Sequence, residues 1–297
     1  MSEQTVLFDA PGPRALRRYR IVAGAGGAVS LLVLAWVLVK LGEKGNLSGA
    51  KWSPFLQTET WTEYIVPGLI GTLKAAAISI VLAGALGLLL GAGRLSRVAP
   101  LRWVCSVVVE FFRAVPVLLM MLFTFALYST NNLFPPSQLS LAAVVTALTL
   151  YNGAVIAELV RAGVGGLPAG QREAGLSVGL TEGQTLRAIL LPQALTAMLP
   201  ALVGQLVVVL KDSALGYVIT YEELLNKANQ VGTSQQNIVP AFLVVAVLFI
   251  VINYGLTKLA GLLERRLNRR GRTAGGAAPG APGQEPVDLM RINTETG

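Results

Sequence analysis

Long uncharged, apolar stretches alternate with short polar segments along the chain. No Asp, Glu, Lys or Arg occurs in five stretches, at residues 21–39, 75–93, 114–157, 188–210 and 228–257. The hydrocarbon core of a bilayer is ~30 Å thick, and a helix of about 20 mostly apolar residues crosses it. Each stretch is long enough to cross once, and the third is long enough to cross twice. The pattern predicts an all-α polytopic membrane protein.

The longest uncharged stretch contains a turn. Residues 129–137 read Ser-Thr-Asn-Asn-Leu-Phe-Pro-Pro-Ser, a composition typical of the connection in a helical hairpin. Backbone groups inside lipid must be hydrogen-bonded within their own segment, which favours helices, and the alternation of barrel strands is absent. We therefore predict six transmembrane helices, near 21–41, 65–93, 107–128, 139–162, 194–217 and 238–262.

The basic residues predict how the chain is oriented. Arginines cluster before the first predicted span and after the second, fourth and sixth, whereas the opposite loops hold only Lys44, Lys51 and Lys227, with Lys40 at a span end. Since Lys and Arg concentrate on the cytoplasmic side, we expect both termini and the loop 163–193 in the cytoplasm. The net charge of +8 then reflects basic loops facing anionic membrane lipid, and we expect no nucleic-acid partner.

Four regions follow from these assignments. We expect a cytoplasmic tail at 1–20, a transmembrane anchor with an external loop at 21–64, the main membrane domain at 65–264, and a disordered cytoplasmic tail at 265–297. The last region is rich in Gly, Ala and Pro, which favours disorder. A signal peptide is the alternative for the first span, but its apolar run lacks a small-residue cleavage pattern, which favours a retained anchor.

The loop between the fourth and fifth predicted spans carries the signals of two short helices. Pro168 suits the first turn of a helix, and Gly179 suits the left-handed residue that ends one. Thr181 and Gln184 match a capping box at the start of the second helix, and Pro192 bends or ends it. This geometry predicts a rigid cytoplasmic projection whose small residues allow close approach of a partner. The alternative is an amphipathic loop lying on the membrane.

This loop resembles the coupling motif of permeases in binding-protein-dependent ABC importers. The family pattern is Glu-Ala-Ala, three residues, Gly, nine residues, Ile, one residue, Leu-Pro. Here the matching positions are Glu173, Ala174, Gly175, Gly179, Ile189, Leu191 and Pro192. Every spacing is kept, and Gly175 stands where alanine is usual. Glycine loosens a helix by about 0.5–1 kcal/mol relative to alanine, so this position bears on the rigidity of the loop.

Other segments narrow the resemblance. Phe111–Pro116 (Phe-Phe-Arg-Ala-Val-Pro), Tyr151–Gly153 (Tyr-Asn-Gly), Gly170–Ala174 (Gly-Gln-Arg-Glu-Ala) and Lys211–Tyr217 (Lys-Asp-Ser-Ala-Leu-Gly-Tyr) are similar to polar amino-acid permeases, in particular those for glutamate uptake in actinobacteria. The resemblance covers most of the chain except the last ~25 residues.

The resemblance implies a type I ABC importer permease fold in a bacterial cell membrane, with a coupling helix and residues 65–264 as the permease domain. The implied partners are a dimer of ATPase subunits, an extracytoplasmic amino-acid-binding protein and a second permease chain, identical or related.

Ionisable residues inside predicted spans are costly and are candidates for function. Lys74, in the second span, can attract a substrate carboxylate or extend to the outer surface. Glu158 with Arg161, and Glu110 with Arg113, are three residues apart and can form structural ion pairs on one helix face.

The resemblance implies a further role for one of these residues. It places Arg113 and Pro116 where a pore-lining helix begins, so we regard them as candidates for a gate.

Two further groups of polar residues are candidates for the transport path. Lys211, Asp212 and Ser213 end the fifth span, where they can line a substrate route or cap the helix. Asn152 and Gln205 lie in mid-span, where such side chains usually hydrogen-bond to a neighbouring helix.

Several chemistries are excluded by the residues present. The chain has no G-x-x-x-x-G-K-[ST] segment, so we expect ATP to be used by a partner subunit and no cofactor to be bound by this chain. With no histidine and one cysteine, Cys105, we expect neither a metal site nor an enzyme. The alternative function is an ion-coupled secondary transporter, which needs broken helices and mid-membrane carboxylates.

Overall fold

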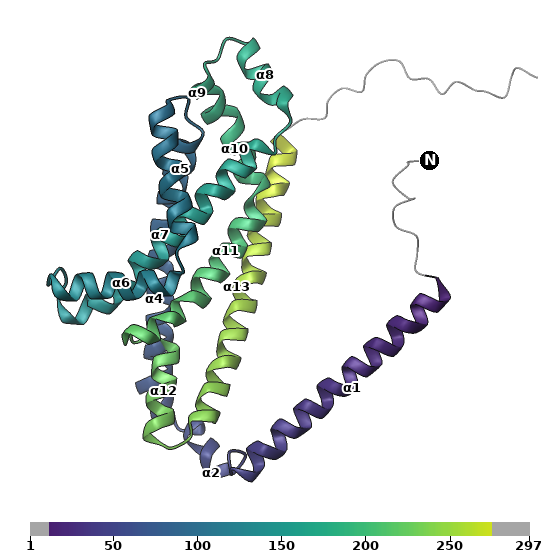
Figure 1. The fold of residues 1–297 in the computed structure, drawn as a ribbon, viewed down its shortest axis with the longest axis vertical. Helices are drawn as coiled ribbons and strands as arrows, with labels where there is room; N and C mark the ends of the chain where they lie inside the picture. Colours follow the sequence, from purple (N-terminus) through teal and green to yellow (C-terminus); the bar gives the residue numbers. More distant parts are fainter. Residues whose placement is uncertain (1–11, 275–297) are drawn as a thin grey trace, which may run out of the picture.

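The protein is a helical bundle, which we describe for residues 12–274 of a computed structural model (Figure 1). No strand occurs within this range. The elements, in chain order, are α1 (Pro13–Glu43), α2 (Gly49–Trp52), η2 (Ser53–Leu56), α3 (Thr58–Thr60), η3 (Trp61–Ile65), α4 (Val66–Arg94), α5 (Ala99–Ala114), α6 (Val117–Thr130), α7 (Pro136–Gly165), α8 (Ala169–Ser177), α9 (Glu182–Thr185), η4 (Leu186–Leu190), α10 (Leu191–Ala197), α11 (Leu199–Asp212), η5 (Ser213–Ile219), α12 (Leu224–Ser234) and α13 (Ile238–Ala274).

Five helical segments are long and apolar enough to cross a membrane. They are Pro13–Glu43, Thr58–Arg94, Pro136–Gly165, Leu199–Ile219 and Ile238–Leu259. The pair α5 and α6 passes the same test together, but the two helices are bent by 101° and give a sixth crossing only if they count as one broken span. The multi-pass helical fold predicted from the sequence is confirmed.

The predicted span at 107–128 is not one continuous helix, because the chain breaks between α5 and α6. Val115 is extended, with φ −85° and ψ 127°, and Pro116 follows it. Proline has no N–H to continue a helical hydrogen-bond ladder, and its ring disfavours the helical conformation at the residue before it. As a result, α6 runs across the long axis of the bundle in Figure 1.

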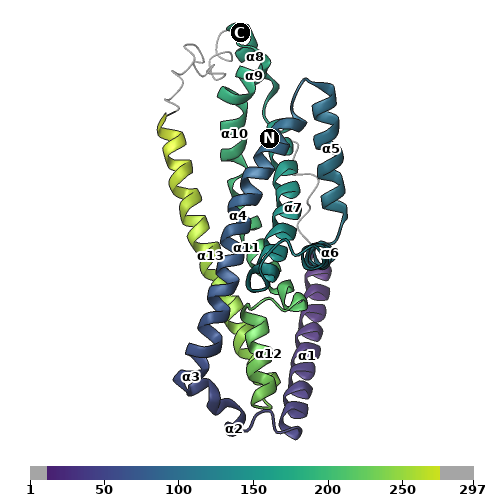
Figure 2. The same cartoon turned by 90° about the vertical axis from the view of Figure 1, so that its left-hand side faces the viewer.

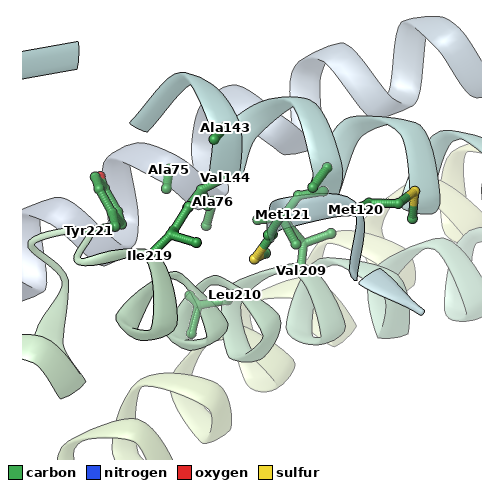
Figure 3. Close-up of a cluster of buried hydrophobic side chains, with 12 residues drawn as sticks. Ala75, Ala76, Met120, Met121, Ala143, Val144, Val209, Leu210, Ile219 and Tyr221 are labelled. Carbon is green, nitrogen blue, oxygen red and sulfur yellow. The ribbon is translucent and has the colours of Figure 1, made fainter. Parts of the chain in front are cut away.

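The turn of α6 places its side chains in the centre of the bundle. Met120 and Met121 of α6 are buried there, between residues of α4, α7 and α11 (Figure 3). The buried members of this cluster are Ala75, Ala76, Met120, Met121, Ala143, Val144, Ala147, Leu148, Val209, Leu210, Ile219 and Tyr221. Methionine fills irregular spaces well because its side chain is unbranched and flexible.

Small residues bring α4 and α7 close together. A Cβ at Gly87 of α4 would lie 2.5 Å from Ile156 Cγ2, and one at Gly153 of α7 would lie 2.9 Å from Leu86 Cδ2. At Gly91 the same atom would meet Val160 Cβ at 2.9 Å. In lipid, where helices gain no hydrophobic drive to associate, such close packing is a main source of helix pairing.

An additional helix, α12, lies between the last two long helices and was not predicted. Glu223 caps it, since its carboxylate accepts hydrogen bonds from the backbone N–H groups of Leu225 (2.8 Å) and Asn226 (2.6 Å). The segment before it packs on the start of α4, where Tyr221 donates a 2.8 Å hydrogen bond to the Gly71 carbonyl. The uncharged run 228–257 therefore contains two helices rather than one span.

The helices at the two ends extend further than predicted. α1 begins at Pro13, so part of the expected tail at 1–20 is helical. α13 continues to Ala274, so the start of the expected disordered tail at 265–297 is also helical. Residues 1–11 and 275–297 of these two predicted tails lie outside the described residues.

α1 stands apart from the remaining helices. None of its residues is buried, and Figures 1 and 2 show it joined to the bundle through the segment that contains α2. Its apolar side chains are exposed around the helix, including Leu32 at 69% and Trp36 at 63%. A helix that is apolar on all sides suits a lipid environment, and the transmembrane anchor at 21–64 stays a prediction.

The contact between α4 and the segment before α12 gives a testable prediction. An added Cβ at Gly71 would lie 2.1 Å from the Glu222 carbonyl oxygen, a backbone atom that cannot rotate away. We expect Gly71→Ala to destabilise the protein by about 1–3 kcal/mol, the usual cost of overpacking. The measurement is the thermal unfolding midpoint of the detergent-purified protein.

Gly84→Ala is the matched control, since it lies on the same helix and a Cβ there meets no atom within 4 Å. Equal unfolding midpoints for the two variants would contradict the packing described for this junction.

Candidate functional site: coupling element and membrane path

The first helix of the cytoplasmic loop ends as the sequence predicts. Gly179 has φ +85°, the left-handed region that favours glycine. The backbone N–H of Leu180 donates to the Gly175 carbonyl at 3.2 Å, and that of Gly179 donates to the Leu176 carbonyl at 3.0 Å. These bonds satisfy carbonyls at the end of α8, as in a Schellman motif. Pro168 lies one residue before α8, at its N-cap, rather than in the first turn.

The second helix begins with the predicted capping box. The Gln184 backbone N–H donates to Thr181 Oγ1 at 3.3 Å, and the Thr181 N–H donates to Gln184 Oε1 at 2.8 Å. Both bonds satisfy donors that a helix start otherwise leaves unpaired. We call residues 168–190 the coupling element, in the sense of the motif that they contain.

The two helices of the coupling element pack against each other at Gly175. This residue is buried, and an added Cβ would lie 2.6 Å from Thr185 Cγ2 and 3.1 Å from Ile189 Cδ1. The glycine in place of the usual alanine therefore lets α8 lie directly on α9 and η4. The absence of a side chain at Gly175 thus contributes to the packing of the element.

The coupling element continues into the membrane through α10. A π-helical turn, η4, precedes Pro192, whose missing N–H breaks the regular helical ladder. Pro192 does not end the helix, because α10 runs on to Ala197. Beyond it, Met198 packs on α7 so closely that a Cβ at Gly163 would lie 1.8 Å from the Met198 sulfur. This contact joins the coupling element to the cytoplasmic end of α7.

An ion-pair group around Glu182 holds the coupling element together. Its carboxylate accepts two hydrogen bonds from Arg172 of α8, from Nε at 3.0 Å and from Nη2 at 2.8 Å, and pairs also with Arg97. The hydrogen bond from Arg172 lowers the pKa of Glu182 below its usual value. The carboxylate therefore stays ionised, and the pair keeps both arginines in place, as the pH falls toward the ordinary range for glutamate.

The first residues of the coupling motif are presented outward. Glu173 and Ala174 are exposed on α8. Glu173 has no ion-pair partner among the described residues, although its neighbours Arg172 and Glu182 pair with each other. Ile189 and Leu191 are half-buried, and Pro192 is exposed. The element thus combines a packed interior with an uncompensated carboxylate on its surface.

A second ion-pair cluster links α4, α5 and α7. Glu158 accepts from Arg94 at 2.6 Å and from Arg161 at 2.6 Å, while Arg113 Nη1 lies 3.6 Å from it. Glu110 pairs with Arg94 at 3.1 Å and with Arg113 at 3.7 Å. The two predicted pairs are therefore present, and Arg94, whose side chain is 9% exposed, joins them.

The other path candidates do not gather around one cavity. Asn152 is fully buried, and its Oδ1 accepts from Gln205 Nε2 of α11 at 2.5 Å, which is the helix-to-helix bond expected for such residues. Ser213 is buried and donates to the Leu210 carbonyl. Lys74 is exposed on α4 and Pro116 is exposed at the bend.

Lys211 lines a groove at the end of α11. The groove has a volume of about 370 Å³ and is otherwise apolar, with Phe242, Val245 and Phe249 of α13 and Leu225 of α12 among its walls. Asp212, the next residue, is half-buried. Of the seven path candidates, only Lys211 lines this groove.

Sequence reasoning missed Arg94, Arg97, Glu182 and Glu223. The first two follow the second span and were read only as markers of orientation. Glu182 lies inside the predicted Thr181–Gln184 capping box. An acidic residue in a first helical turn is common there, so it did not indicate an ion pair. The ion-pair partners of Arg94 and Arg97 are far away in the chain, and no spacing rule connects residues 97 and 182. Glu223 instead bonds to the backbone of the next residues, Leu225 and Asn226, and was missed because glutamate is not among the preferred N-cap residues.

The fold and the loop define a class, that of membrane-spanning transport subunits with a packed cytoplasmic coupling element. The chain belongs to the family described as "Binding-protein-dependent transport system inner membrane component", which residues 83–269 match. It is a permease subunit of an ABC importer, a transport component rather than an enzyme. The family implies an ATPase and a substrate-binding protein as partners.

Curated relatives support the family assignment. The chain is 50% identical over 232 residues to the glutamate transport system permease protein GluD of Corynebacterium glutamicum, covering 78% of this chain and 85% of that protein. It is 35% identical to the probable glutamine ABC transporter permease protein GlnP of Bacillus subtilis, covering 68% and 93%. It is 30% identical to the glutamate/aspartate import permease protein GltK of Escherichia coli O157:H7, covering 68% and 93%.

Solved structures share the fold. The chain superposes on a crystal structure of an amino acid ABC transporter with histidines with a TM-score of 0.65 and 30% identity, covering 71% of this chain and 98% of the other. The MetNI methionine ABC transporter in an inward-facing conformation gives a TM-score of 0.59 at 23% identity, covering 71% and 99%, and shows likeness of fold alone.

The packing inside the coupling element gives the second prediction. We expect Gly175→Ala to separate α8 from α9, because the new Cβ meets Thr185. If tryptic cleavage after Arg187 follows local opening, a cost of about 1–3 kcal/mol raises its rate by about five-fold or more. The measurement is the cleavage rate in the purified protein, followed by mass spectrometry.

Gly175→Ala combined with Thr185→Ala should return cleavage toward the wild-type rate, because the second change removes the atom that clashes. Thr185→Ala alone is the control. Cleavage of Gly175→Ala at the wild-type rate would show that the two helices are not in close contact.

Proposed function

We propose that this chain is the permease subunit of an ABC importer for a polar amino acid, and that the amino acid is glutamate. The observation that carries the proposal is the packed coupling element that displays Glu173 without an ion-pair partner among the described residues. A carboxylate on a rigid surface suits docking to a basic site on an ATPase. The 50% identity to a glutamate permease supports the substrate.

The mechanism that we propose is alternating access driven from outside the chain. Two ATPase subunits close on ATP and move the coupling elements of two permease chains. The permease pair then opens toward an external binding protein that delivers the amino acid, and hydrolysis resets it. The chain supplies the translocation path and the coupling element. It binds no cofactor itself, and the partner subunit binds and hydrolyses ATP.

We propose that the chain lies in a bacterial plasma membrane with both termini in the cytoplasm. The distribution of arginines supports this orientation. α13 ends toward the end of the molecule that carries α8 and α9, and α1 points away from the opposite end, where α2 joins it (Figure 1). The second permease chain is either a copy of this one or a related chain, and lipid covers the remaining apolar surface.

Candidate roles for the intramembrane residues fit this mechanism. Arg113 and Pro116 flank the break between α5 and α6, where a change of bend would open or close a path. Lys211 can attract a carboxylate at its groove, with Asp212 and Ser213 beside it. Asn152 positions α7 against α11. Lys74 remains a candidate contact on the exposed face of α4.

Uptake by the reconstituted transporter tests the proposal. We expect the complex of permease, ATPase and binding protein in liposomes to accumulate labelled glutamate only with ATP. Glu173→Lys should reduce this uptake by about ten-fold or more, since reversing one charge of a docking pair costs several kcal/mol. Glu59→Lys, the same change on an exposed residue of α3, is the matched control.

Uptake that ignores ATP and follows an ion gradient would overturn the importer and favour a secondary transporter. ATP-dependent uptake of another amino acid, without glutamate, would overturn only the substrate.

A further inference from the structure

A surface residue outside the coupling element reaches into it. Arg97 lies in the short link between α4 and α5, and its guanidinium pairs with Glu182 at the start of α9. The Arg97 side chain is 72% exposed, whereas that of Glu182 is 17% exposed. The carboxylate is thus largely covered, and the arginine reaches it from outside.

Glu182 connects three segments of the chain. It belongs to α9, it binds Arg172 of α8 with two hydrogen bonds, and it binds Arg97 of the α4–α5 link. The bidentate pair with Arg172 fixes the direction of the carboxylate. Movement of the coupling element therefore displaces the anion to which the α4–α5 link is attached.

The α4–α5 link leads on toward the bend in the membrane. Arg94, at the end of α4, pairs with Glu110 of α5 and Glu158 of α7. α5 then runs to Val115 and Pro116, where the chain turns by 101° into α6. The link is thus joined to the helix that ends at the bend.

We propose that Glu182 is a positioning residue that ties the coupling element to the α4–α5 link through Arg97. Through this tie, movement of the coupling element reaches α5 and the Pro116 bend. This connection through Arg97 is separate from the contact between Met198 and α7, which also joins the loop to the membrane helices. The proposal rests on the proposed function, because it concerns how ATPase movement enters the membrane domain.

The pair contributes to coupling more than to stability. Exposed ion pairs stabilise folded proteins little, with measured values of about 0.2–1 kcal/mol. Loss of Arg97 therefore leaves the fold intact. A variant that only lowered the amount of folded transporter would reduce uptake and ATP hydrolysis by the same factor. The ratio of glutamate transported to ATP hydrolysed separates the two cases.

The experiment measures this ratio for the full complex in liposomes. The variants are Arg97→Gln, which removes the charge, Arg97→Lys, which keeps it, Glu182→Gln, and the double variant Arg97→Gln/Glu182→Gln. Arg20→Gln is the matched control, since it removes an exposed arginine charge on α1, away from the α4–α5 link and from Glu182.

We expect Arg97→Gln to lower the ratio about two- to five-fold, the range that an exposed ion pair permits. Arg97→Lys and Arg20→Gln should stay near the wild-type ratio. In the Glu182→Gln background, Arg97→Gln should have no further effect, because its partner charge is already absent. A wild-type ratio in Arg97→Gln, or the same loss in both backgrounds, would overturn the proposal.

A second measurement tests the tie without transport. Amide hydrogen exchange of residues 95–98 in the purified protein should rise equally in Arg97→Gln and Glu182→Gln. Unchanged exchange in both variants would overturn the tie. If the wild-type complex fails to transport with ATP, the proposed function is wrong, while the exchange result still decides whether the tie exists.

Discussion

Backbone hydrogen bonding inside lipid is the constraint on which the rest of this structure depends. In a membrane-spanning helix the backbone N–H and C=O groups pair within the helix, and where the helix breaks a neighbouring group has to supply the missing partner. At Pro116 the missing donor is that of proline itself. Before α12, Thr72 Oγ1 accepts from the Leu224 N–H at 3.1 Å. These two breaks turn α6 into the core and fold α12 against α4.

In the loop 163–193 the backbone groups at the helix ends are also paired, here by capping residues of the loop itself. Its helix ends are closed by Gly179 and by the Thr181–Gln184 box, so their backbone groups are paired within the loop itself. Its interior is closed by Gly175 against Thr185. When a partner bound at Glu173 moves the coupling element, two contacts pass this movement on. Met198 contacts α7, and Arg97 connects the element to the α4–α5 link.

Much of this could be predicted from the sequence, because local signals decide it. The length of the uncharged stretches predicted the membrane spans, and short-range capping patterns predicted the two helices of the loop. The apolar pattern ran one span through Pro116 because proline occurs both inside and at the ends of membrane helices, whereas the family resemblance placed the start of a helix there. α12 was missed because its residues continue an uncharged run. The contacts of Arg94, Arg97 and Glu182 depend on tertiary packing, which no local pattern encodes.

The central claim is that the coupling element moves as one rigid body. The most direct test is amide hydrogen exchange of residues 169–190 in the assembled transporter, with and without ATP. The account predicts slow exchange in both states, since the caps and the Gly175 contact persist while the element moves. Exchange that becomes as fast as in an unfolded peptide in either state would contradict it.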